Sequence, residues 1–112
     1  MALRFPLVAA VALAAAEPAM AAPATLAFVN GTGNDIAAME ARRTGSSGWA
    51  AVPYSARSGT SASASFDVED CAWDLKVTLA GGRTLTFANV NLCEAQLLTL
   101  RQRDGVAWVD YD

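Results

Sequence analysis

The sequence predicts an all-β fold, a small antiparallel β-sandwich of about seven short strands with Ig-like or Greek-key connections, after a cleaved signal peptide. Three observations carry this prediction. Turn-forming residues recur roughly every ten positions, apolar and polar residues alternate in the clearest segment, and two cysteines fit a single bridge. Regular turn spacing of this kind favours a sandwich or barrel over strands that alternate with helices.

The first residues have the order of a secretory signal peptide. Arg4 supplies the positive charge, Phe5–Ala16 form an apolar run, and Ala19-Met20-Ala21 is a small-x-small cleavage site. The apolar run is too short to span a bilayer as a helix. We therefore expect residues 1–21 to be removed, leaving 22–112 as a single domain that is periplasmic or secreted and has no membrane anchor.

Charge and residue types exclude several functional classes. The chain has 8 basic and 11 acidic side chains, and the signal takes one of each, so the net charge stays at −3. A mildly acidic domain does not attract phosphate backbones, and nucleic acid is not expected as a partner. Histidine is absent, which removes the commonest general base and metal ligand. No phosphate-binding glycine motif is present. We expect no enzymatic activity and no cofactor.

The chain contains two cysteines, Cys71 and Cys93. In an exported protein an even number of cysteines indicates a disulfide. Closing this loop would stabilise the fold by roughly 3 kcal/mol in the chain-entropy description. A domain of this size has a small core and is marginal without such help.

The first strand of the domain is predicted over Thr25–Val29, which is short and apolar. A dense cluster of turn-forming residues follows at 30–35. Within it, Asn30-Gly31-Thr32 also fits a glycosylation acceptor, but the turn interpretation is favoured.

Residues 36–43 are ambiguous between helix and strand. Asp35 could cap a helix, and most residues of Ile36–Arg43 are good helix formers. Because the neighbouring segments are strands, we favour a strand. Further along, Ala56–Ser65 has the composition of a linker, and Ser63–Phe66, which overlaps its end, can form an edge strand.

The clearest strand is Ala72–Ala80, which presents one apolar and one polar face. A three-residue loop over 81–83 would set Leu79 opposite Leu85 on the next strand. The same register would set Cys71 opposite Cys93, in agreement with a cross-strand bridge. The residues that follow Phe87 then face the wrong side, so we expect a bulge near Asn89.

The last hairpin is predicted from Gln96–Arg103, the turn Asp104-Gly105, and Val106–Tyr111. Asp-Gly between alternating segments is a strong hairpin signal.

Acidic residues gather around the first cysteine, which raises the possibility of a metal site. Several carboxylates close together are what calcium requires, and the candidates are Asp67, Glu69, Asp70 and Asp74. Their spacing does not match an EF-hand loop. A solvated acidic loop leading into a strand is the favoured interpretation.

Three aromatic residues, Trp49, Tyr54 and Trp108, are candidate contacts for a partner. Trp49 and Tyr54 lie close together in a Gly/Ser-rich stretch, and if exposed they could stack on a sugar or anchor a protein. Trp49 folded inward as a plug of the sandwich is the favoured alternative. Trp108 and Tyr111 lie on opposite faces of the last strand, so at least one should be exposed.

Several short motifs occur in an order that resembles the one found in a family of short exported bacterial proteins. That family has a single small disulfide-containing β-sandwich domain and no established activity. The similarity covers roughly residues 25–100, and the motifs that carry it are Asn30-Gly31-Thr32-Gly33, the Trp49 loop, Cys71–Val77, Asn91–Glu94 and Leu98–Leu100. The resemblance implies that the two cysteines pair and that Ile36–Arg43 is a strand. It transfers no functional residue.

The sequence therefore leads by exclusion to a non-enzymatic module that binds a protein or surface partner of unknown identity. The alternative is a metal-binding accessory protein that uses the acidic stretch.

Overall fold

The computed structural model describes residues 23–67 and 69–112, and this part of the chain forms eight strands and no helix. The predicted signal peptide, residues 1–21, lies outside the described residues. The strands are β1 (Pro23–Gly31), β2 (Ile36–Arg43), β3 (Ala50–Val52), β4 (Ser61–Asp67), β5 (Ala72–Leu79), β6 (Thr84–Asn91), β7 (Leu97–Arg103) and β8 (Val106–Tyr111). Over these ranges, no helix has the length and apolarity needed to cross a membrane.

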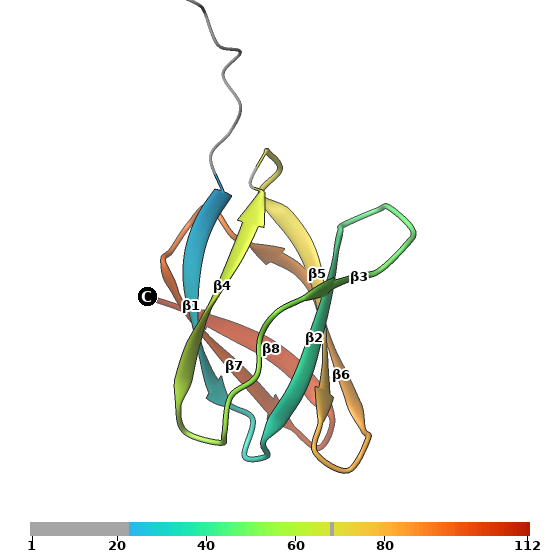
Figure 1. The fold of residues 1–112 in the computed structure, drawn as a ribbon, viewed down its shortest axis with the longest axis vertical. Helices are drawn as coiled ribbons and strands as arrows, with labels where there is room; N and C mark the ends of the chain where they lie inside the picture. Colours follow the sequence, from blue (N-terminus) through green and yellow to red (C-terminus); the bar gives the residue numbers. More distant parts are fainter. Residues whose placement is uncertain (1–22, 68) are drawn as a thin grey trace, which may run out of the picture.

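Two four-stranded sheets face each other in a sandwich, which confirms the predicted fold class (Figure 1). One sheet has the order β4-β1-β7-β8 and the other β3-β2-β5-β6. Pairing is antiparallel throughout except between β1 and β7, which are parallel. The short strand β3 was not anticipated from the sequence, because its Ala-Ala-Val run carries no alternation.

The core lies between the sheets and is built from the inward faces of both. Phe28 and Leu98 from one sheet and Leu75, Val77 and Phe87 from the other are at most 1 % exposed. Edge-to-face aromatic contacts join the layers, since the Phe66 ring of β4 lies 5.8 Å from that of Trp73 in β5, and the Phe28 ring lies 5.8 Å from that of Tyr54. Such edge-to-face contacts add to the free energy of apolar burial.

Residues 36–43 form a strand, as favoured above. Met39 and Ala41 are buried in the core, whereas Glu40 and Arg42 lie on the outer face. Burial with period two against β5 overrides the helix propensity of this segment. A bulge between Ile36 and Ala38 shifts the register at its start.

The predicted register of the β5–β6 hairpin is wrong by two residues. Leu85 lies opposite Val77, not Leu79, and the last regular pair is Thr78 with Thr84. The three-residue turn covers Ala80–Gly82 instead of 81–83, because the Leu79 N–H donates to the Arg83 carbonyl at 2.7 Å, and Gly81 and Gly82 adopt positive φ. A slip of two residues keeps every side chain on its predicted face.

The predicted bulge near Asn89 is present. Trp73 pairs with Val90 and Leu75 with Phe87, so that Asp74 lies opposite two residues. Asn89 adopts a φ of 55°, a left-handed conformation that asparagine tolerates better than most residues.

The predicted disulfide joins Cys71 and Cys93, with Cα atoms 5.2 Å apart. The two cysteines are not directly opposite in the ladder. The Leu92 N–H donates to the Cys71 carbonyl at 2.8 Å, so Cys93 lies one residue beyond the paired position. The bridge ties the start of β5 to the chain just after β6.

The loop after β1 is organised by the side chain of Asn30, which is fully buried. Its amide nitrogen donates to the carbonyls of Asn34 at 2.7 Å and Ala56 at 2.9 Å. Its oxygen accepts from the N–H and hydroxyl of Thr32. These bonds make Asn30 a turn-forming residue that is inaccessible as a modification site.

Candidate functional site

The acidic residues singled out from the sequence point to different places. Asp70 and Glu69 are exposed, and Asp70 forms an ion pair with Arg43 at 3.1 Å. Asp74 is buried on the outer face of β5. The side chain of Asp67 lies outside the described residues. Within residues 23–67 and 69–112, no group of three or more acidic, Cys or His side chains is arranged to hold a metal ion.

Asp74 has its own set of partners. Its carboxylate accepts from the Asn89 N–H at 2.9 Å, the Thr44 hydroxyl at 2.9 Å and the Arg42 Nε at 3.0 Å. The backbone bond from Asn89, with help from Thr44 and Arg42, lowers the pKa of Asp74 below its ordinary value although burial opposes this. This carboxylate therefore holds a bulge and a neighbouring strand in place.

Trp49 lies outside the core, so the expectation that it plugs the sandwich is wrong. Its ring lies 4.3 Å from the Arg42 guanidinium carbon and 4.6 Å from Lys76 Nζ. Arg42 and Lys76 are on the outer face of the β2–β5 pair, where Lys76 also pairs with Glu40 at 3.5 Å. Trp49 covers this charged face. A flexible loop rich in Gly and Ser can place its Trp on the outer face of a sheet as easily as in the core.

Tyr54 occupies the place expected for Trp49. It is 7 % exposed, and its hydroxyl donates to the Phe28 carbonyl at 3.0 Å. Burial raises the pKa of Tyr54 to about 12. The prediction that Tyr54 is an exposed contact for a partner is therefore wrong. One side of the residue instead lines a surface hollow.

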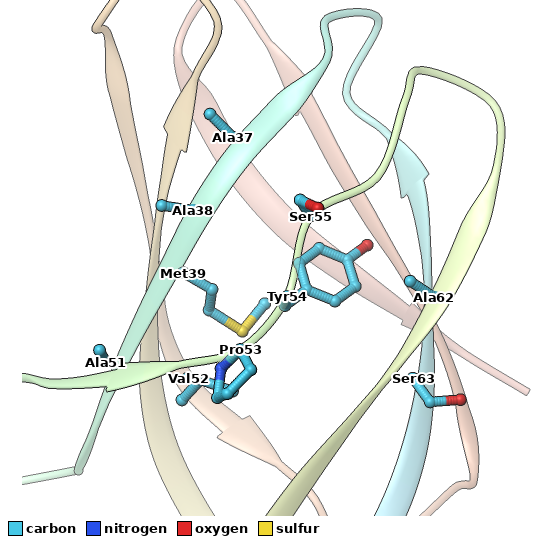
Figure 2. A pocket seen from close by; sticks show the side chains of 10 residues that line it. All are labelled: Ala37, Ala38, Met39, Ala51, Val52, Pro53, Tyr54, Ser55, Ala62 and Ser63. Atoms are coloured by element: carbon cyan, nitrogen blue, oxygen red, sulfur yellow. The ribbon is translucent and has the colours of Figure 1, made fainter.

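The hollow, of about 620 Å³, opens between the two sheets on the side where β3 and β4 are the edge strands. Figure 2 shows Met39 from β2 and Tyr54 meeting in its middle, with Val52 and Pro53 along one side and Ala62 along the other. The segment after β3 runs between β2 and β4 (Figure 1). Apolar side chains thus line an open depression beside a sheet edge. The lining residues are Ala37, Ala38, Met39, Ala51, Val52, Pro53, Tyr54, Ser55, Ala62 and Ser63.

Strand β4 presents an unpaired edge beside this hollow. The Asn30 N–H donates to the Thr60 carbonyl at 2.8 Å, which places Thr60 in a hydrogen-bonded pair with β1. Because antiparallel pairs alternate, Ala62 and Ala64 also bond to β1, whereas the N–H and C=O groups of Ser61, Ser63 and Ser65 point away from it. No described residue pairs with those outward groups.

A second exposed surface is formed by the last two strands. In the described part of the chain, all large hydrophobic residues that are exposed lie on β7 and β8, namely Leu97, Val106, Trp108 and Tyr111. Trp108 is 41 % exposed and lies directly opposite Arg101, which pairs with Asp110. Tyr111 points instead toward β6, where its hydroxyl accepts from the Asn91 N–H at 2.9 Å.

Sequence reasoning placed an edge strand at Ser63–Phe66 but did not connect it with a binding site. The signal was present as Ser and Ala alternating without charge or proline from Ser61 to Ser65. The residues across the hollow, Val52 and Pro53, had no such signal, because their proximity to β4 depends on the tertiary fold.

No protein-family model matches the chain. No curated protein matches it either. Among solved structures, the chain is similar to the NMR structure of a protein from Eubacterium rectale, with a TM-score of 0.52 and 14 % sequence identity. The alignment covers 87 % of this chain and 94 % of the other. At this identity the likeness supports the fold alone.

Proposed function

We propose that the protein is an exported, non-enzymatic binding module that captures an extended polypeptide segment of a partner along β4. The observation that carries the proposal is the unpaired edge of β4 lying directly beside an apolar hollow. The Cys71–Cys93 disulfide is compatible with a periplasmic or extracellular location and supports the export part of the proposal.

Strand addition of this kind needs two features. Main-chain groups supply affinity, and pockets for alternate side chains supply specificity. Here Ser61, Ser63 and Ser65 offer the main-chain groups, while Val52 and Tyr54 line the depression beside them.

The chemistry of the hollow defines the side chain that would enter it. Its walls are aliphatic and aromatic, and none of the described residues that line it is charged. A segment with an aliphatic or aromatic residue at the central position is therefore the expected ligand class, because a charged side chain would lose hydration there without finding a partner.

Selection from a displayed library of random heptapeptides against residues 22–112 tests the proposal. Selected peptides should be extended, with apolar residues at alternate positions. Titration of one synthetic peptide, followed by amide NMR, should shift the signals of Ser61, Ser63 and Ser65 first. Enrichment of no peptide, or shifts confined to β7 and β8, would contradict the proposal.

Two variants sharpen the test. Ser63→Pro removes one outward N–H without removing a bond to β1, and Pro53→Glu puts a charge on the wall of the hollow. Each should weaken peptide binding by roughly tenfold, the effect of about 1.4 kcal/mol. Ser47→Glu, at an exposed position in the β2–β3 loop, is the matched control and should bind as the unmodified chain does.

A further inference from the structure

The edge of β4 differs from the other sheet edges because it lacks the features that usually prevent a second strand from pairing there. Strand β3 is three residues long, β6 carries the bulge at Asn89, and β8 is tied to β6 through Tyr111 and Asn91. Short length, bulges and cover are the usual means by which proteins block pairing at sheet edges. From Ser61 to Ser65, β4 has none of these and no charged residue.

The sequence of this edge is symmetric about Ser63. Reading outward from Ser63, each side has Ala and then Ser. In an antiparallel pairing of two copies with Ser63 on the twofold axis, Ser61 would face Ser65 of the second copy and Ala62 would face Ala64. Each outward N–H would meet an outward C=O, because all three serines point their main-chain groups to the free side.

Charges beyond the strand fit the same arrangement. Arg57 precedes β4 and Glu69 follows it, and both are exposed. Antiparallel pairing brings the beginning of one strand to the end of the other, so that Arg57 of each copy approaches Glu69 of its partner. A parallel pairing would instead place like charges at the same end.

We propose that β4 pairs antiparallel with β4 of a second copy of this chain, with Ser63 on the twofold axis. The arrangement is closed, since the same edge is used by both copies and no free β4 edge remains for growth. A ladder of this length buries less than the roughly 1,200 Å² of a standard interface, so the dimer should be weak and depend on concentration.

The pairing has a regulatory consequence that rests on the proposed function. A second copy on β4 occupies the main-chain groups that an extended peptide would use. Dimer formation and peptide capture therefore compete, and the binding site is blocked in the dimer.

Sedimentation velocity of residues 22–112, from low micromolar to millimolar concentration, tests the pairing. The unmodified chain should shift from monomer to dimer. Ser63→Glu and Ser63→Lys each place like charges opposite one another on the axis and should weaken association by roughly tenfold or more. An equimolar mixture of these two variants should associate more strongly than either alone, since the introduced carboxylate of one chain then faces the introduced ammonium of the other.

Ser47→Glu and Ser47→Lys are matched controls, because they add the same charges at an exposed position away from β4. They should dimerise as the unmodified chain does. A chain that stays monomeric throughout, a Ser63→Glu variant that dimerises normally, or a mixture no stronger than its components would overturn the pairing. If the chain captures a peptide but never dimerises, the proposed pairing is contradicted and the proposed function is not. If the chain dimerises but its diluted monomer captures no peptide, the proposed function is contradicted and the pairing is not.

Discussion

The carboxylate of Asp74 accepts a hydrogen bond of 2.9 Å from the main-chain N–H of Asn89, the residue that bulges out of β6. The same oxygen accepts from Thr44, and the other oxygen accepts from Arg42 on the neighbouring strand. One buried side chain thus stabilises a bulge on one side and fixes the end of β2 on the other.

Replacement of Asp74 by Asn should make the fold less stable at neutral pH, by about 1–3 kcal/mol, because the charge-assisted bonds are lost. The native pKa of Asp74 is lowered, so its contribution is present above the unfolded-state pKa and disappears as pH falls through the native one. Urea unfolding from pH 7 down to the acid range should show the variant and the original chain converging at low pH.

The control for this experiment is Asp104→Asn, at an exposed turn position whose φ of 53° suits asparagine as well as aspartate. It should change the free energy of unfolding at neutral pH by no more than about 0.5 kcal/mol. A gap between the Asp74→Asn chain and the original that stays constant with pH would show that Asp74 does not titrate as described.

Hairpins were the part of the fold most open to prediction. At Asp104-Gly105 both residues adopt positive φ, and Arg103 pairs with Val106 as the dipeptide indicated. For β5 and β6 the alternation determined which side chains face the core, but it could not determine the register. A slip of two residues leaves the alternation intact, and the position of the turn, at Ala80–Gly82 instead of 81–83, decides between the two registers.

Tyr54 and Trp49 should differ sharply in their effect on stability. Tyr54→Ala removes a buried ring and should lower the free energy of unfolding by about 3–5 kcal/mol. Trp49→Ala removes contacts with Arg42 and Lys76 on an outer face and should lower it by about 1 kcal/mol or less. Denaturant unfolding of both variants gives the comparison directly.

Tyr54→Phe is the matched control, since it keeps the ring and deletes only the bond to the Phe28 carbonyl. A loss of about 1 kcal/mol is expected. If Trp49→Ala proved as damaging as Tyr54→Ala, Trp49 would have to be part of the core.

The binding surface was less predictable than the fold, for a physical reason. Aromatic residues drew attention as candidate anchors, yet packing decides which of them are exposed: Tyr54 is buried while Trp108 is 41 % exposed. The edge of β4 depends on which strand lies next to which, and the parallel pairing of β1 with β7 leaves β4 at the margin. The local pattern predicted an edge strand at Ser63–Phe66, but no local pattern indicates that Val52 and Tyr54 lie beside it.

Loss of the disulfide should lower the melting temperature markedly. The bridge closes a loop with a sequence separation of 22, and the chain-entropy description gives roughly 3 kcal/mol for a loop of this size. For a domain this small, that corresponds to a fall of more than about 10 °C. Calorimetry of Cys71→Ser should show the fall, and a reducing agent should reproduce it in the original chain but have no further effect on the variant. Melting that neither change affects would contradict a structural role.

Asn30→Asp tests whether the loop after β1 depends on the amide of Asn30. The two side chains have nearly the same shape, but aspartate would turn a carboxylate oxygen toward the carbonyls of Asn34 and Ala56, which now accept from the amide nitrogen. Because the site is fully buried, a carboxylate oxygen that faces two carbonyls and no donor should destabilise the fold by more than about 3 kcal/mol, although Thr32 still donates to the other oxygen. Burial would also raise the pKa of the new carboxyl, so the defect should lessen as pH falls and the group becomes neutral. Asn34→Asp, at an exposed position of the same loop, is the control for the added charge and should change stability little. Urea unfolding at neutral and acid pH separates the cases, and equal stability of the two variants would show that the amide bonds of Asn30 do not hold the loop.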